Sequence, residues 1–140
     1  MNHVRRALFA IVILAGMLAL FNSDAANTQY GFSQGAAYPT GLSPAGIDAE
    51  DLNGDGVVDV VTADGVSNSM SVLIGNTDGT YQPRKVFAVG RNPSDVKLAR
   101  LEGPSKPWDA IVTNNDDNTM TIWWGDGKGG FSSSSLFQTG

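Results

Sequence analysis

The sequence predicts an all-β fold of β-propeller blades, each a four-stranded antiparallel repeat, with about two full blades and one leading strand belonging to a larger propeller. Three observations predict it. The chain repeats itself at a spacing of about fifty residues, which lies in the range of propellers and solenoids. Within each repeat, short runs of β-branched or alternating apolar residues are bounded by Gly, Asn, Asp and Pro, as in strands joined by turns. Beyond the amino-terminal apolar run, no stretch has the apolar period of a helix.

The first residues have the pattern of a secretory signal peptide, which we assign to residues 1–25. Arg5 and Arg6 form a positive start, residues 7–21 are almost continuously apolar, and small residues precede the expected cleavage before Ala26. A membrane anchor is the alternative, but this run of about fifteen residues is shorter than the roughly 20 that a spanning helix needs. We therefore expect a secreted protein, extracellular or periplasmic, with no membrane span after cleavage.

The remaining chain is acidic and lacks two catalytic residue types. Residues 26–140 hold seven Lys and Arg against thirteen Asp and Glu, a net charge of −6, which disfavours nucleic acids and anionic membranes as partners. The single histidine, His3, lies in the expected signal peptide, and the chain has no cysteine. An imidazole base, a thiolate nucleophile and a histidine-bound zinc are therefore excluded from the mature chain.

The repeat sets the domain organisation. An offset of 50 residues aligns two full units without a gap from Asp59 onwards, and an offset of 49 aligns the residues before it, so the second unit has one extra residue ahead of Asp109. The units are residues 42–90, with the acidic loop described below, and residues 91–140, preceded by a leading strand of a partial blade at 26–41. The matched residues include Met70 with Met120, Gly75 with Gly125, Gly79 with Gly129, and Phe87 with Phe137.

The residue pattern of each unit predicts four consecutive strands. The strands of the first unit are expected at residues 45–50, 57–63, 70–74 and 85–89. Those of the second are expected at residues 95–101, 109–113, 120–124 and 136–139. Turns rich in Gly, Asn and Asp separate them, and the run of serines at 132–135 is expected to form a loop or an edge-strand segment.

The acidic loop at residues 51–59 is the clearest chemical signal. Oxygen-bearing side chains stand at alternate positions, and glycines allow a tight turn, which together suit one hard cation with six to eight oxygen ligands, as Ca²⁺ requires. The expected ligands are the side chains of Asp51, Asn53, Asp55 and Asp59 and the main-chain carbonyl of Val57.

Two further points define this calcium prediction. An EF-hand needs a glutamate at the twelfth loop position, which here is Thr62 inside a strand pattern, so the loop closes on Asp59. Carboxylates about 4 Å apart repel each other by roughly 1 kcal/mol in water and about 4 kcal/mol at an effective dielectric of 20, and a cation removes that repulsion. A solvated acidic turn without metal is the alternative.

The equivalent loop of the second unit has lost the pattern. Arg100 stands at the first ligand position and Pro104 at the third, Lys106 follows, and only the final residue, Asp109, is kept. We expect this loop to bind no calcium and to be held by proline stiffness and by Trp108.

The first unit combines the pattern Asp-x-Asn-x-Asp-Gly-x-x-Asp at residues 51–59 with a Val-rich strand, the run Val-Leu-Ile-Gly-Asn at 72–76 and Gly-Thr-Tyr at 79–81. This combination resembles the FG-GAP or VCBS repeats, the repeat type that also builds the propeller of integrin α-subunits. The resemblance covers residues 30–140, although the literal Phe-Gly and Gly-Ala-Pro signatures are missing. It implies four-stranded blades, calcium between the first two strands of a blade, and extracellular recognition or adhesion.

Trp123 and Trp124 are adjacent on a predicted strand, so their rings should point to opposite faces of the sheet. Packing against neighbouring blades is one reading, and an exposed platform that stacks a sugar or peptide ligand is the other. Asp116 and Asp117 stand in an Asn-rich segment, where a tight polar turn is expected and a second cation site is the alternative.

We expect a noncatalytic, calcium-stabilised recognition or adhesion module that binds an extracellular protein or glycan. One alternative is a propeller-type polysaccharide hydrolase or lyase, which needs two carboxylates at a fixed separation. The other is a structural propeller part of a larger secreted enzyme. Closed propellers use about four to eight blades, so we expect further blades in a longer chain, an oligomeric ring or a small open stack.

Overall fold

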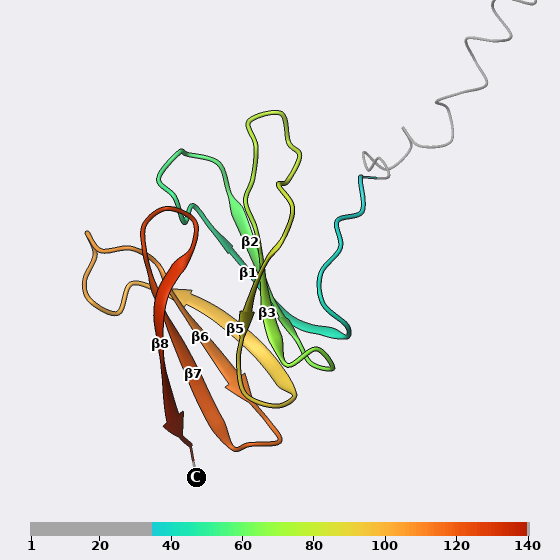
Figure 1. The fold of residues 1–140 in the computed structure, drawn as a ribbon. Helices are drawn as coiled ribbons and strands as arrows, with labels where there is room; N and C mark the ends of the chain where they lie inside the picture. The colour runs from blue at the N-terminus through green and yellow to red at the C-terminus, as the bar shows by residue number, and fades with distance from the viewer. Residues whose placement is uncertain (1–34, 140) are drawn as a thin grey trace, which may run out of the picture. The chain divides into compact units, whose positions relative to one another are not determined.

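Residues 35–139, which the computed structural model describes, form two four-stranded antiparallel sheets (Figure 1). The first sheet has the order β1 (Pro44–Glu50), β2 (Asp59–Asp64), β3 (Ser69–Leu73) and β4 (Lys85–Ala88). The second has the order β5 (Pro93–Ala99), β6 (Asp109–Asn114), β7 (Thr119–Gly125) and β8 (Phe131–Gln138). The described residues contain no helix that is long and apolar enough to cross a membrane.

Each predicted repeat unit contains one of these sheets, so the all-β repeat architecture is confirmed for the described residues. The strands lie within about two residues of the predicted ranges, apart from the last. Strand β8 begins at Phe131 and not at residue 136, because the serines of its first half pair with β7 through backbone groups. The described part of the predicted leading strand, residues 35–41, forms no strand. The predicted signal peptide and residues 26–34 lie outside the described residues.

Left-handed backbone recurs at matching repeat positions. Asn68 and Asn118 have φ values of 51° and 49°, and each closes the turn between the second and third strands of its sheet. Ser43 and Asn92 have φ values of 54° and 51° and precede the first strand of each sheet. Asparagine tolerates this conformation better than most side chains. The two units therefore share their turn geometry as well as their strand order.

The two sheets pack through faces that we call the front face of the first sheet and the back face of the second. Residues that pair directly in the register lie on the same face of a sheet. The register therefore assigns each of the residues named below to its face. All of them belong to one hydrophobic cluster. The front face of the first sheet carries Val61, Ala63, Met70, Val72 and Phe87, and the back face of the second carries Val96, Leu98, Ala110, Val112 and Trp123.

These two faces occupy different repeat positions. Val61 corresponds to Ile111 in the second unit, whereas its neighbour Val60 corresponds to Ala110. Ile111 and Ala110 point to opposite sides of the second sheet, because successive strand residues alternate. The sheets are therefore stacked in the same sense, front to back, and they do not close into a ring within the described residues.

Aromatic and polar contacts join the two sheets. The ring of Phe87 lies edge-on to the rings of Trp123 and Phe131, with centroids 5.1 and 5.2 Å away. Asp48 in β1 accepts a hydrogen bond of 2.9 Å from the backbone N–H of Leu98 in β5, and these two strands lie side by side. Edge-on aromatic pairs add about 0.5 to 1.5 kcal/mol beyond the burial of their surface.

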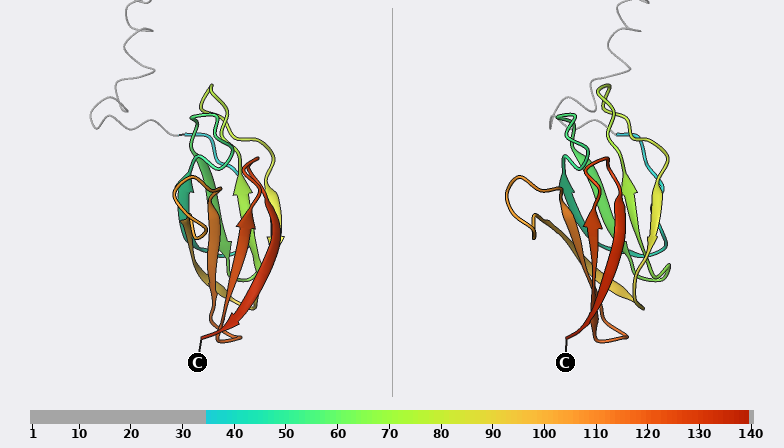
Figure 2. Two further views of the ribbon diagram at one scale, coloured as in Figure 1. Left: turned by 90° about the vertical axis from the view of Figure 1, so that its left-hand side faces the viewer. Right: turned by 60° about the vertical axis from the view of Figure 1, so that its left-hand side comes forward.

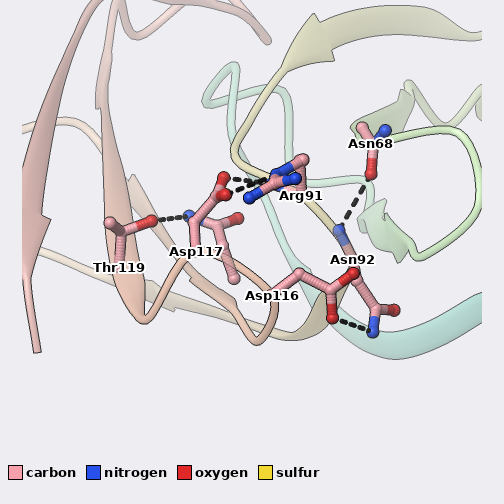
Figure 3. A network of polar contacts seen from close by, with 7 residues as sticks. Asn68, Arg91, Asn92, Asp116, Asp117 and Thr119 are labelled. Carbon is pink, nitrogen blue, oxygen red and sulfur yellow. Dashed lines mark hydrogen bonds and ion pairs between the residues drawn. The ribbon is translucent and has the colours of Figure 1, made fainter.

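A polar network ties the connection between the sheets to the neighbouring turns (Figure 3). The backbone N–H of Asn92 donates to the side-chain oxygen of Asn68 in the first unit, and its side-chain amide donates to Asp116 in the second. Arg91 pairs with Asp117. The Asp116–Asp117 pair, considered above as a second cation site, is thus engaged with the segment that enters β5.

The loops that concern function gather at one end of the sheets. Figure 2 shows the β1–β2 connection and the β3–β4 and β7–β8 hairpins at one end of the sheets, and β8 finishes at the opposite end. The β5–β6 connection is also at that end, because its residues line one groove together with those of the β1–β2 connection. This shared end brings the predicted calcium loop close to its degenerate counterpart.

Candidate functional site

The acidic loop between β1 and β2 is organised around Asp51. Its Oδ1 accepts the backbone N–H of Gly54 at 2.7 Å and that of Asp55 at 3.2 Å, and its Oδ2 accepts the N–H of Gly56 at 2.9 Å. These bonds, chiefly that from Gly56, hold the pKa of Asp51 below its usual value. Gly54 and Gly56 have φ values of 81° and 83°, which a residue with a Cβ rarely adopts. The glycines therefore let the loop wrap around one carboxylate.

Asn53 and Asp55 complete the exposed part of the loop. The side-chain oxygen of Asn53 accepts the N–H of Asp55 at 2.9 Å, and its amide donates to Oδ2 of Asp55 at 2.8 Å. Oδ1 of Asp55 accepts the N–H of Val57 at 2.8 Å. Each oxygen-bearing side chain thus folds back on the residues that follow it, as Asx turns do. The result is a compact loop with carboxylate and amide oxygens concentrated in it.

Asp59 has a different role from the other predicted ligands. It is fully buried at the start of β2, where its carboxylate accepts the backbone N–H of Leu52 at 3.0 Å and that of Gly75 at 2.8 Å. Burial raises its pKa, the two N–H bonds oppose that shift, and the negative charges of Asp55 and Asp51 raise it further. Asp59 therefore joins the loop to the β3–β4 hairpin.

The degenerate loop keeps this connection without the rest of the motif. Asp109 accepts the N–H of Leu101 at 3.0 Å and that of Gly125 at 2.9 Å, which are the counterparts of Leu52 and Gly75. The final aspartate of the motif thus has a structural role that does not depend on a metal. A buried carboxylate that accepts two backbone N–H groups supplies acceptors that those donors would otherwise lack.

The oxygen-bearing side chains of the acidic loop suit calcium, but the structure does not bring all of the predicted ligands together. Asp51, Asn53 and Asp55 place hard oxygens at alternate positions on one loop, as Ca²⁺ prefers. Within residues 35–139, however, no three acidic side chains converge as a metal-binding group. The structure brings Asp51, Asn53 and Asp55 together, whereas the carboxylate of Asp59 is directed at backbone N–H groups. Calcium binding here stays a prediction.

The degenerate loop is held by Arg100. Its guanidinium lies 4.6 Å from the centre of the Trp108 ring and also donates to the carbonyl oxygen of Pro104. A cation over an indole face gains about 0.5 to 1 kcal/mol at an exposed site. Trp108 thus packs against the loop, as predicted from the sequence, and Arg100 contributes a contact that the sequence pattern did not reveal.

A groove of about 260 Å³ lies between the two loops. One wall is formed by the acidic loop, including Asp51 and Asn53, and the other by Arg100, Lys106 and Trp108 of the degenerate loop. The groove therefore has a negative wall facing a positive wall that also carries an indole ring. This combination offers partners for a charged group and a flat surface for an apolar ring.

The two adjacent tryptophans lie on opposite faces of the second sheet. Trp123 packs against Phe87 of the first sheet, and its Nε1 donates to the carbonyl of Ala88 at 3.1 Å. Trp124 lies on the front face, where its Nε1 donates to Ser135 at 3.1 Å. Ligand stacking on either ring stays a prediction.

Sequence reasoning identified the acidic loop but not the groove. Arg100 and Lys106 were interpreted as signs of a lost metal site and Trp108 as a residue that holds the degenerate loop, although the repeat already aligned this loop with the acidic loop. Comparison with protein-family models, with curated proteins and with solved structures finds no match for this chain.

Proposed function

We propose that the protein is a secreted, noncatalytic recognition module of FG-GAP or VCBS type, a calcium-stabilised portion of a β-propeller that binds an extracellular ligand through the groove between its two inter-strand loops. The groove is the observation that carries the proposal. It lies where unlike loops of consecutive repeats meet, and recognition residues commonly sit on loops that a rigid β scaffold positions.

The chemistry of the groove favours an acidic ligand that also has an apolar face, such as a uronic-acid glycan or an acidic segment of a protein. Lys106 and Arg100 supply positive charge beside Trp108. Carboxylates bind guanidinium groups well, and sugar rings or side chains stack on indoles. Residues 35–139 contain neither histidine nor cysteine, and a binding role requires neither.

Calcium supports the opposite wall of the groove. We propose that the ion is held by Asp51, Asn53, Asp55 and the carbonyl of Val57, with Asp59 next to them. A bound cation offsets the mutual repulsion of the carboxylates and favours the ordered loop. The affinity for the ligand should then depend on calcium, because Asp51 and Asn53 line the groove.

A direct test measures binding of the secreted protein to immobilised uronic-acid glycans and to matched neutral glycans, in calcium and in chelator. We expect retention on the acidic glycans in calcium and a loss of about tenfold in affinity for Lys106→Gln, which corresponds to about 1.4 kcal/mol. Lys97→Gln is the matched control, because it removes the same charge from β5, outside the groove.

Two results would contradict the proposal. Equal retention on acidic and neutral glycans, unchanged in Lys106→Gln, would exclude the groove as the recognition surface. Release of new reducing ends or of unsaturated products from the bound glycans would show catalysis and favour a polysaccharide hydrolase or lyase.

A further inference from the structure

The front face of the second sheet repeats a surface that is buried elsewhere in the same chain. Successive residues of β6 and β7 alternate between the two faces of the sheet. The register shows which residues lie on the front face, opposite the back face that packs on the first sheet. Six apolar residues lie on this side of the sheet, Leu101 just after β5 and Ile111, Met120, Ile122, Trp124 and Phe137 on the strands, at the repeat positions of Leu52, Val61, Met70, Val72, Ile74 and Phe87. Polar residues of the same face include Lys97 and Thr113.

Exposure separates these two matching sets. In the first sheet, Val61, Met70 and Val72 are 0% exposed, because the second sheet covers them. In the second sheet, Leu101 and Phe137 are each 44% exposed, Ile111, Met120 and Trp124 are half-buried, and Ile122 is 8% exposed. No element among residues 35–139 packs against this front face in the way that the second sheet packs against the first. The front face of the second sheet is thus more exposed than its counterpart in the first sheet, above all at Leu101 and Phe137.

The back face of the first sheet shows the complementary relation. Ile47 is 63% exposed, whereas its counterpart in the second sheet, Val96, is 0% exposed at the junction between the sheets. Val86 shares this face and is 55% exposed, whereas Leu73 and Ser71 in its centre are 5% and 0% exposed. Each end of the two-sheet stack therefore has exposed apolar side chains on a face whose repeat counterpart is packed at the junction.

We propose that two copies of this chain associate head to tail, with the front face of the second sheet of one copy packed on the back face of the first sheet of the next. The occupant is a second copy because one chain carries both halves of the interface, and their packing is already realised between its own sheets. An interface of two different patches extends into a closed ring or an open series, not into a symmetric pair.

A polar contact at the existing junction indicates the register of this association. Asn68 accepts the backbone N–H of Asn92 at 2.8 Å. Their repeat counterparts across the new interface are Asn118 of one copy and Ser43 of the next, and both pairs share the same left-handed backbone. The Asn118 side chain is therefore placed to accept the Ser43 N–H as Asn68 accepts that of Asn92.

Sedimentation of the secreted protein between about 1 µM and 1 mM tests this association. The parent mass should rise with concentration, and Phe137→Glu should raise the dissociation constant at least about tenfold, since it places a charge in an apolar contact. Leu136→Glu is the matched control, because Leu136 is the preceding residue on β8, points to the opposite face and is 61% exposed. Circular dichroism confirms that each variant is folded.

A mixing experiment separates head-to-tail association from a symmetric pair. Phe137→Glu retains an intact back face, and Ile47→Glu retains an intact front face, so an equimolar mixture should form a one-to-one complex while each variant alone stays monomeric. Self-association of Ile47→Glu would show that two front faces pair with each other and would overturn the proposal. A parent protein that stays monomeric at the highest concentration, or a native product in which a longer chain covers the front face, would overturn it as well.

Discussion

Asp117 accepts two hydrogen bonds from Arg91, one from its backbone N–H and one from its guanidinium Nε, each 2.6 Å long. The pair joins the β6–β7 turn to the segment that connects the sheets (Figure 3). The backbone N–H of Arg91, followed by its guanidinium, holds the pKa of Asp117 below its usual value. A carboxylate whose pKa is lowered by folding stabilises the folded state above its unfolded pKa, and this stabilisation is lost as the pH falls through the folded value.

Asp117→Asn should therefore weaken the acid sensitivity of the fold. We expect its urea midpoint to fall less than that of the parent between about pH 6 and about pH 2, since one carboxylate no longer needs to be protonated. Asp116→Asn is the control, because it removes the neighbouring charge of the same turn and leaves both hydrogen bonds between Arg91 and Asp117 in place. An unchanged pH profile in Asp117→Asn would contradict the link between this pair and stability.

Calcium should raise the melting temperature of the parent protein. At ten times the dissociation constant, a ligand that binds only the folded state adds about 1.4 kcal/mol. Asp55→Ala should abolish this rise, because Asp55 is one of the exposed ligands proposed here. Asp78→Ala provides a control in the β3–β4 hairpin, where Asp78 bonds Thr80 outside the acidic loop. A parent melting temperature that does not respond to calcium or to chelator would remove the metal from the proposal.

The aspartate that ends the degenerate loop should matter for stability without calcium. Asp109→Ala leaves the N–H groups of Leu101 and Gly125 without their acceptor, and we expect a loss of about 2 to 3 kcal/mol in the free energy of unfolding. This loss should be the same in calcium and in chelator. Glu102→Ala, an exposed change in the same loop, should stay within about 0.5 kcal/mol of the parent. Urea denaturation of Asp109→Ala with a parent-like midpoint would exclude the structural role.

Matching phenylalanines in the two units should differ in their contribution to stability. Phe87→Ala removes a ring that packs between Trp123 and Phe131 and should cost about 3 kcal/mol. Phe137→Ala changes the same repeat position where the side chain is 44% exposed, and it should cost less than about 1 kcal/mol in dilute monomer. Denaturation at micromolar concentration measures both, and equal losses would contradict the stacking of unlike faces.

Most of the fold could be predicted from the sequence, because the strand signals are local. Apolar alternation and turn residues located seven of the eight strands within about two residues of their observed bounds. Strand β8 was predicted too short, since Ser132 to Ser135 show no apolar alternation and are held by backbone pairing with β7. The way in which the sheets stack was not predicted, because alternation shows that two faces differ but not which face meets which.

The candidate site was only partly predictable. The ligand spacing identified the acidic loop, but the role of Asp59 depends on the N–H of Gly75, sixteen residues away, which spacing alone cannot place. The one signal that was present is that Asp109 survives in a loop that has lost the other ligands. A residue kept where the metal pattern is lost indicates a second, structural function, and the structure shows that function in the paired backbone bonds.

The strand order has a consequence for the speed of folding. Every ladder joins strands that are neighbours in the sequence, from β1–β2 through β7–β8. Contacts of this kind close short loops and give a low contact order, which favours fast folding compared with β proteins whose strands pair at long range. Each sheet can therefore assemble from its own hairpins, and the slower step is expected to be the docking of one sheet onto the other.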